Sequence, residues 1–454
     1  MRRFKFFILA ILFLMTLFIH SGIAVSQDSY GYDEISFLTR FSGIGARAIG
    51  LGGAYIGISE DYSALYWNPA GLGQIKKMEL MTSMNHLTHS TNADFLNNII
   101  KDNMSSTRLD AVGFVLPVPT YRGSLVFAFG YNRVENINSI LSFEGFNPGA
   151  SAVSKLFEEP YIPNSLYQSE NVTRTGSIGN YSFGFSTEVG EGILIGGSLN
   201  YWRGKYDYNF VLREIDRQNL YETYPNDFDN YYLENNINSE LRAWDIKVGC
   251  LYRVNKNLRV GATINSPKVF NIKELWDQND QIVFDDGTSD PTEDNGVTEY
   301  DVRLPFTFGA GASITFPRFL ISGDIEYYDW SQIEYQTDPP FDWATRSEVN
   351  RNIKHSIEPV INKRVGVEVL LPGLKNKIRL GYIICPNPLK ASTSDSDRKY
   401  FTIGGGFILG TQTMLDIAYV RGWWKNESID DYIDVKVKED RKISKIYATI
   451  SFRF

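Results

Sequence analysis

The chain is poor in the residues that build disulfide frameworks, metal sites and nucleophilic centres. Its 454 residues include only two cysteines, Cys250 and Cys385, and four histidines. Neither cysteine has a Cys or His at ligand spacing, which excludes a disulfide-rich scaffold and a four-cysteine zinc site. His86 and His89 lack the glutamate of an H-E-x-x-H helix. We therefore predict no catalytic residue, no metal site and no cofactor, and hence a protein that is not an enzyme.

Positive charge and long apolar runs are also scarce. The formal net charge is −8 and the mean hydropathy is −0.23. A chain with this excess of acidic residues is not expected to bind nucleic acid. Beyond residue 19, no stretch is long and apolar enough to cross a bilayer as a helix, which excludes a polytopic helical membrane protein. Aromatic residues make up 14% of the chain, which excludes a disordered protein.

The first 26 residues have the three parts of a secretory signal peptide. Residues 1–5 are basic, residues 6–19 are almost wholly apolar, and Ala24 and Ser26 are placed as an A-x-S cleavage site. An uncleaved anchor is the alternative, but an apolar run of about fourteen residues is short for a span that needs about twenty. We expect cleavage after Ser26. The mature chain is then either soluble outside the inner membrane or spans an outer membrane as strands.

Apolar and polar side chains alternate along much of the mature chain, which predicts β-strands with two unlike faces. Between Phe319 and Tyr327, one face is apolar while Asp324 and Glu326 lie on the other. The same pattern recurs at residues 181–185, 244–252, 365–369 and 415–419. Alternation alone does not distinguish the core of a soluble sandwich from the lipid face of a membrane barrel.

The lengths of the connections decide between these two alternatives. We predict fourteen strands, over residues 78–85, 111–117, 124–134, 177–189, 193–211, 243–254, 258–270, 302–316, 319–333, 364–371, 377–384, 400–409, 414–424 and 445–454. Short turns such as Gly190-Glu191-Gly192 alternate strictly with long polar connections such as residues 86–110 and 212–242. Tight turns at one end and long loops at the other are the layout of an outer-membrane barrel. The sequence therefore predicts an all-β, 14-stranded antiparallel transmembrane β-barrel over residues 78–454.

The last predicted strand agrees with a bacterial outer-membrane location. Ile446, Ile450 and Phe454 share one face, and the sequence ends on that Phe. Outer-membrane barrels commonly end in this way, and the likeness implies recognition by the barrel assembly machinery. Trp423 and Trp424, near a strand end, fit an aromatic girdle where the barrel meets outer-membrane lipids.

Residues 27–77 do not alternate and are rich in small side chains. A barrel of about eight strands fills its lumen with side chains and one of about sixteen leaves a channel, so fourteen strands should leak unless plugged. A run of small residues from Gly43 to Tyr55 is followed by Asn68-Pro69-Ala70-Gly71-Leu72. Because small residues let a backbone fold tightly against a wall, we predict an N-terminal hatch, or plug, inside the lumen.

Here the sequence resembles a known family. The segment from Ala46 to Leu72, with its Gly- and Ala-rich run, short acidic spacer and Asn-Pro-Ala-Gly-Leu ending, is similar to the hatch of the FadL/TodX long-chain fatty acid and hydrocarbon transporters. Further motifs match at residues 303–309, 323–331, 364–368 with 379–382, and 404–406 before 415–419. The likeness spans the mature chain. It implies a 14-stranded barrel plugged by its N-terminus.

The resemblance implies passive transport of hydrophobic molecules, either fatty acids or hydrocarbons, through a hatch-gated barrel. Such proteins capture the molecule at the outer loops and release it when the hatch moves, sideways into the membrane near the third strand. Six residues are expected to shape the hatch and its hinge: Gly50, Gly52, Gly53, Asn68, Pro69 and Ala70. The alternative is that these residues only allow a compact plug.

The predicted capture site lies on the long loops. Apolar side chains that could contact the ligand are Leu220, Tyr221, Tyr224, Phe228, Tyr231 and Tyr232 in the third loop and Phe95 and Leu96, at roughly helical spacing, in the first. The alternative is that they pack against one another, as long loops commonly do. Lumen arginines such as Arg364 and Arg379 could bind a fatty acid carboxylate or pair with wall carboxylates. The sequence therefore does not decide whether the ligand is a fatty acid or a neutral hydrocarbon.

Two other functions fit the same fold. The barrel could act as a binding or attachment partner in protein secretion, or as an envelope scaffold without transport. Uptake of a labelled hydrophobic molecule would distinguish transport from both alternatives.

Overall fold

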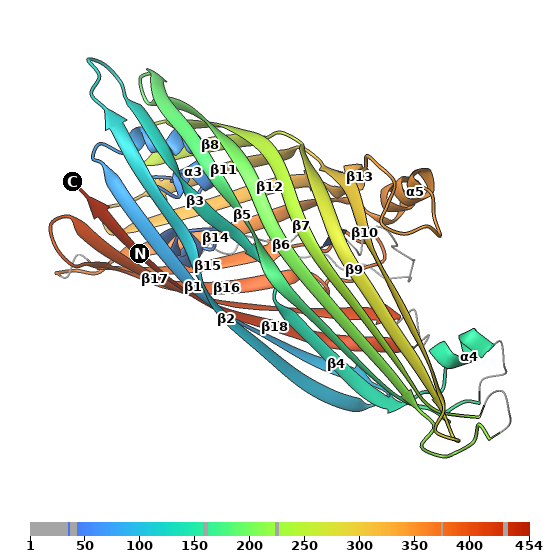
Figure 1. Ribbon diagram of the computed structural model, residues 1–454. Coiled ribbons are helices and arrows are strands. Elements are labelled where there is room, and N and C mark those ends of the chain that lie inside the picture. Colours follow the sequence, from blue (N-terminus) through green and yellow to red (C-terminus); the bar gives the residue numbers. More distant parts are fainter. Residues whose placement is uncertain (1–34, 37–42, 158–161, 223–226, 374–375, 430–434) are drawn as a thin grey trace.

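The computed structural model describes residues 35–36, 43–157, 162–222, 227–373, 376–429 and 435–454. The predicted signal peptide and the first part of the predicted hatch lie outside the described residues. Within them, the chain forms a closed antiparallel β-barrel with short helical segments inside it and at its outer end (Figure 1). No helix in the described ranges is both long and apolar enough to cross a membrane.

The wall has fourteen strands, as predicted, four of which are interrupted and carry two labels each. The continuous strands are β1 (Glu79–Phe95), β2 (Asn98–Val118), β5 (Tyr167–Gly190), β6 (Ile193–Ile215), β7 (Phe228–Arg253), β14 (Pro359–Leu370), β15 (Lys377–Cys385), β16 (Arg398–Ile408), β17 (Thr413–Ile429) and β18 (Lys436–Arg453). The interrupted strands are β3 with β4 (Leu125–Asn136, Ser139–Phe146), β8 with β9 (Leu258–Asn265, Lys268–Phe284), β10 with β11 (Ser289–Leu304, Thr307–Thr315) and β12 with β13 (Phe319–Asp329, Glu334–Tyr335). Pairing of β1 with β18 closes the barrel.

An apolar band covers the outward face of the wall. On β7, Trp244, Ile246 and Val248 are exposed by 58%, 53% and 55%, whereas Asp245 and Lys247 between them are buried. A soluble sandwich would bury the apolar face instead. An exposed apolar face over a polar interior is the arrangement of a barrel in a membrane.

The strands on one side of the barrel are much longer than predicted. β2 has 21 residues and β7 has 26, whereas the sequence predicted strands over residues 111–117 and 243–254, and a membrane-spanning strand needs about ten residues. Residues 86–110 and 212–242, predicted as loops, mostly continue the β1–β2 and β6–β7 hairpins. The prediction was wrong because both faces of these outer hairpins carry polar residues, which removes the alternation of a half-buried strand.

The helical spacing expected in the first loop is also wrong. Phe95 ends β1, and Leu96 lies in the tight turn to β2 with a φ of 54°. His86 and His89, placed beyond the first strand by the sequence, lie within β1. Both errors have the same origin, because β1 continues as a polar hairpin past residue 85.

The described residues also form helical segments between strands of the wall. α4 (Ala152–Phe157) follows β4, the short η3 (Trp330–Gln332) follows β12, and α5 (Arg346–Ser356) lies between β13 and β14. Figure 1 shows α4 beyond the tips of the long strands and α5 beside the shorter ones. A capping box of Thr345 and Glu348 begins α5. Its buried Val349 and Ile353 pack onto an apolar cluster at the outer part of the lumen.

The outward apolar band predicts that a charged side chain placed on it lowers the free energy of unfolding, most of all near the middle of the membrane. Val248→Arg should lower the free energy of unfolding by about 2–4 kcal/mol, because the guanidinium would face hydrocarbon. Val248→Leu is the matched control and should stay near wild type. Urea unfolding in lipid vesicles measures both, and equal stability of the two variants would contradict a lipid-facing band.

Candidate functional site

The described part of the predicted hatch lies inside the lumen and is called the plug below (residues 43–77). It consists of α2 (Ala46–Gly50), α3 (Ala64–Trp67), η2 (Pro69–Gln74) and the turns between them. Gly52 and Gly53, after α2, have φ values of +66° and +67°, a conformation that residues with side chains disfavour. Pro69 opens η2, where its missing N–H costs no helical hydrogen bond.

Paired glycines of the wall form the surface on which the turn after α2 lies. Gly366 of β14 and Gly381 of β15 are register partners. A Cβ on Gly366 would lie 2.3 Å from the carbonyl oxygen of Leu51, and one on Gly381 would lie 2.2 Å from the nitrogen of Gly52. Any larger residue at either position would therefore push the plug away from the wall.

Asn68 ties η2 to the opposite set of strands. Its side-chain amide donates to the carbonyl oxygens of Ile56 in the plug and Cys250 in β7, both at 3.0 Å. Its Oδ1 accepts from the nitrogen of Ala70 at 3.2 Å, which caps η2. A Cβ on Gly249 would lie 2.1 Å from this oxygen. Asn68 thus forms hydrogen bonds both within the plug and to the wall.

Asp324 of β12 holds the middle of the plug. Its carboxylate accepts from the backbone nitrogens of Tyr55 and Ile56 at 2.6 and 2.7 Å. Pairing with a lumen arginine was one expectation for the wall carboxylates, whereas both of these hydrogen bonds of Asp324 are with the plug. The hydroxyl of Thr402 on β16 donates to the carbonyl oxygen of Gly50 at 3.1 Å, a second such tether.

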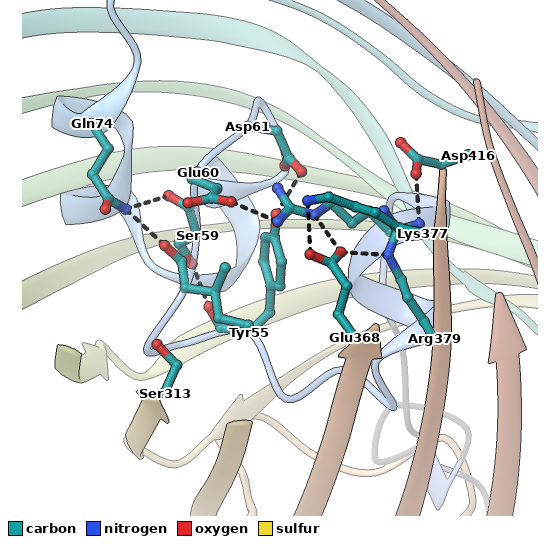
Figure 2. A network of polar contacts seen from close by, with 12 residues as sticks. Tyr55, Ser59, Glu60, Asp61, Gln74, Ser313, Glu368, Lys377, Arg379 and Asp416 are labelled. Carbon is teal, nitrogen blue, oxygen red and sulfur yellow. Dashed lines mark hydrogen bonds and ion pairs between the residues drawn. The ribbon is translucent and has the colours of Figure 1, made fainter. Parts of the chain in front are cut away.

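A chain of alternating charges links the plug to the wall (Figure 2). Arg47 of α2 pairs with Glu60 at 2.5 Å and with Glu368 of β14 at 3.4 Å. Glu368 pairs in turn with Arg379 at 2.8 Å, and Arg379 with Asp416 at 2.6 Å. Each buried charge has an opposite neighbour, which offsets the cost of removing it from water. Pairing of wall arginines with wall carboxylates is confirmed for Arg379 here.

Glu60 of the plug stays ionised. Burial raises the pKa of this carboxyl, but Arg47 and Arg259 beside it lower it further, to about 2. Arg259 of β8 lies 2.9 Å from the second carboxylate oxygen. The charge link between plug and wall therefore persists throughout the physiological pH range.

A cavity with about 120 Å³ of free volume lies against the outer side of α3 and is called the chamber below. Leu65 and Tyr66 of α3 form one part of its lining, and the wall supplies the rest. Its aromatic wall residues are Trp202, Phe270, Tyr328 and Trp330. The rest of the lining is largely polar, so the chamber offers aromatic rings and fixed polar groups side by side. Fixed polar groups of this kind orient a small molecule in its site.

The charged groups of the chamber balance one another. Three cations, Lys247, Lys268 and Arg364, and three carboxylates line it. Lys268 lies 3.1 Å from Asp245 and 3.9 Å from the centroid of the Trp202 ring. Arg364 pairs with Glu326, as the sequence allowed, and Lys247 donates to backbone carbonyls of the plug. The chamber therefore offers no surplus positive charge for a carboxylate ligand.

The residues predicted to capture a ligand lie far from the chamber, at the outer end of the long strands. Phe95, Tyr221, Phe228 and Tyr231 meet in one apolar cluster that also holds Phe143 of β4. The rings of Phe95 and Phe143 are 4.8 Å apart, and those of Tyr221 and Phe228 are 4.9 Å apart. Side chains that the sequence placed on separate loops thus pack on one another.

The other predicted capture residues are not part of this cluster. Leu96 and Leu220 are exposed, and Tyr232 points away from the interior, against Arg213 at 5.4 Å and Glu234 at 2.8 Å. Tyr224 lies outside the described residues. Sequence reasoning missed the chamber altogether, because its lining comes from one or two residues on each of many strands.

The wall is interrupted beside the plug. β2 pairs with the third strand only from Val118↔Leu125 to Ala111↔Asn132, and β3 then bulges between Arg133 and Glu135. Further out, side chains replace the ladder: Arg108 donates to the carbonyl oxygen of Gly176 at 2.9 Å and to Asn138 at 3.1 Å. We call this region the wall gap.

Tyr62 of the plug lies at the base of the wall gap. Its hydroxyl donates to Oδ1 of Asn132 at 3.0 Å. Gly113 and Gly130 are register partners. A Cβ on Gly113 would overlap the ring of Tyr62, and one on Gly130 would lie 2.2 Å from its hydroxyl oxygen. The absence of side chains on these two glycines therefore makes room for the tyrosine at the point where the ladder ends.

Metal ligands do not gather in the part of the chain that the structure describes. No group of three or more His, Cys, Asp or Glu side chains there could hold an ion. The ring of His86 is hydrogen-bonded to Thr107 at 2.8 Å.

Comparison with solved structures identifies the fold. The P. putida toluene transporter TodX matches with a TM-score of 0.60 and 13% identity over 91% of this chain and 99% of its own. A Pseudomonas aeruginosa FadL homologue matches with a TM-score of 0.60 and 12% identity, over 91% and 98%. The Ralstonia pickettii toluene transporter TbuX matches with a TM-score of 0.51 and 14% identity, over 92% and 100%. No protein-family model and no curated protein sequence matches the chain.

The class defined by this architecture is the plugged 14-stranded barrel. More particularly, the fold is that of the FadL/TodX-type barrels, over nearly the whole length of both chains. The resemblance found in the sequence is confirmed at this level.

The tethers predict that Asp324 keeps the plug closed. Asp324→Ala should weaken the plug by about 3 kcal/mol, because two buried backbone donors lose their acceptor. Asp324→Asn, which keeps one acceptor oxygen, should show a smaller effect. Single-channel recordings in planar bilayers measure this as larger and more frequent openings. A conductance of Asp324→Ala equal to wild type would contradict the role of the tether.

Proposed function

We propose that the protein carries hydrophobic molecules passively across the outer membrane, from the chamber through the wall gap into the lipid. The observation that supports this most directly is the position of residues 61–67. Leu65 and Tyr66 line the chamber, while Tyr62, less than one helical turn earlier, lies at the base of the wall gap. One short segment of the plug thus separates the two spaces.

Movement of this segment would connect the chamber with the bilayer. Neighbouring parts of the plug have different tethers: α2 is held by the alternating charges, and η2 by Asn68 and Ser186. α3 lies between them and packs its Leu65 against the wall at Gly184. We infer that α3 and η2 shift together, which breaks the hydrogen bonds of Asn68 and Ser186 between η2 and the wall, while α2 stays in place. Gly50, Gly52 and Gly53 would then shape the hinge of the hatch, and Asn68, Pro69 and Ala70 its moving part.

The substrate class follows from the chamber. Its lining is rich in aromatic rings, and its cations are balanced by carboxylates and carbonyl oxygens. A neutral hydrocarbon would leave these pairs intact, whereas a fatty acid would compete with them for a cation. TodX and TbuX are toluene transporters by name, which agrees with a neutral ligand. We keep long-chain fatty acids as the second substrate class to be tested.

The outer cluster serves structure rather than capture in this proposal. Phe95, Phe228 and Tyr231 are buried against one another, so a ligand would have to break their packing. We place the membrane lipids around the apolar band and expect the barrel assembly machinery to insert the chain. Neither step requires a cofactor.

A reversible lock on the plug tests the proposal. The hydroxyl of Ser186 on β5 donates to the carbonyl oxygen of Ala70 at 2.7 Å, so cysteines at 70 and 186 would join η2 to the wall. We expect the oxidised double variant, made in a Cys250→Ser background, to lose uptake of labelled toluene and oleate. Reduction should restore uptake.

Each single-cysteine variant is a control and should transport under both conditions. Toluene and oleate are assayed separately, because loss of one alone identifies the substrate class. Unchanged uptake by the oxidised variant would contradict hatch-gated transport and favour an attachment partner or a scaffold.

The chamber predicts a second, local effect. Trp202→Ala should weaken toluene binding about tenfold, because the loss of a large apolar contact is worth about 1.5–3 kcal/mol. Trp244→Ala removes the same side chain from the lipid-facing side of the neighbouring strand and is the matched control. Binding is measured by fluorescence competition on purified protein, and equal losses in the two variants would place the ligand outside the chamber.

A further inference from the structure

The outer part of β10 is an open sheet edge. β10 pairs with β9 along its whole length. On its other side, the only ladder partner among the described residues is the two-residue β13, opposite Val302 and Arg303. From Ser289 to Glu299 the strand therefore has a neighbour on one side only. Natural proteins usually shorten or cover such edges, because the unpaired backbone groups accept another strand.

The register shows which backbone groups face the open side. The N–H of Asp301 donates to Thr337, and its C=O accepts from Gln336, so both point away from β9. Backbone direction alternates along an antiparallel strand. The N–H and C=O groups of Glu293, Val297 and Glu299 therefore also face the open side. These positions continue the line of β13, and they span about 20 Å at about 3.3 Å per residue.

Proline limits this edge without disturbing the hairpin. Pro291 has the same parity, so its missing N–H falls on the open side and costs no bond to β9. The N–H of Asn295 already donates to the carboxylate of Asp294 at 2.8 Å, so Asn295 is not counted among the donors that an added strand would use. The edge that can accept a strand is thus the short stretch of residues 293–299, and we call it the β10 edge.

The hairpin around the β10 edge carries charge of one sign. Between Lys273 and Arg303 there are ten acidic residues and no Lys or Arg. Six of the ten are exposed: Asp285, Asp286, Asp290, Glu293, Asp294 and Glu299. Acidic chains would be repelled here, and a basic chain would be attracted. The charge thus selects the partner as well as discouraging self-association.

An apolar contact lies within the acidic surface. Val297 and Leu275 are register partners on the same face of the hairpin, and they are exposed by 60% and 53%. Alternate residues of an added strand would lie beside them, because side chains share a face every second residue. A segment with alternating basic and apolar residues would match both features.

We propose that the β10 edge docks an extended Lys- or Arg-rich segment of a partner protein by strand addition. The segment would lie beside residues 293–299 as a continuation of β13. Main-chain hydrogen bonds to the β10 edge would supply affinity, while the acidic residues and Val297 would supply specificity. This docking does not depend on transport through the chamber.

A synthetic nine-residue peptide of alternating lysine and valine tests the docking on the full-length protein in detergent. Fluorescence anisotropy measures binding of the peptide, and hydrogen exchange measures protection of amides 293–299. Val297→Pro removes one open-side donor and leaves the β9 ladder intact, so it should weaken binding at least tenfold. Val297→Thr keeps the donor and should stay within about twofold of wild type.

Two further peptides separate strand addition from charge attraction. An N-methylated peptide with the same charges should bind at least tenfold more weakly, and one with glutamate in place of lysine should not bind. The same shift in gel migration on heating as in wild type verifies that Val297→Pro folds. Equal binding to Val297→Pro and wild type, equal binding of the methylated peptide, or no protection of residues 293–299 would each overturn the proposal.

Discussion

The structure depends on satisfying the backbone of a plug that has little secondary structure of its own. Short helical turns leave part of their N–H and C=O groups without internal partners, and inside a barrel several of these groups find partners in the wall. Asp324 supplies them for Tyr55 and Ile56, and Thr402 for Gly50. Such bonds need close approach, which wall glycines such as Gly381 permit. The plug is therefore fitted to one position, and any passage through the lumen requires some of these bonds to break.

Much of the fold could be predicted from the sequence because apolar and polar side chains alternate with a period of two residues along the membrane-spanning strands. Alternation and turn chemistry predicted fourteen strands, and all are present. The outer parts of β1, β2 and β7 were missed because polar residues lie on both faces of these hairpins, which hides the alternation of a half-buried strand. The chamber could not be predicted, since Trp202, Phe270 and Trp330 are brought together only by strand register. The sequence does not distinguish Asp324 from the other charged residues on the lumen face. Only its hydrogen bonds to the plug backbone reveal its role.

The chamber and the β10 edge are two separate candidate binding regions, and their chemistry differs. The chamber lies inside the barrel, is lined partly by aromatic rings and is balanced in charge, which suits a small neutral molecule. The β10 edge is open, acidic and offers backbone donors, which suits an extended basic chain. They lie on different parts of the barrel: the chamber against α3, and the β10 edge on an outer hairpin beyond β13. A barrel of this kind could transport a small molecule and hold a protein partner without one site obstructing the other.

The central claim is that a hydrophobic molecule occupies the chamber next to α3. Diffraction from crystals grown with a brominated aromatic hydrocarbon, recorded at the bromine absorption edge, tests it most directly. The account predicts an anomalous peak between Trp202 and Tyr66, together with a displaced α3. Bromine found only along the outward apolar band, with α3 unmoved, would contradict the account.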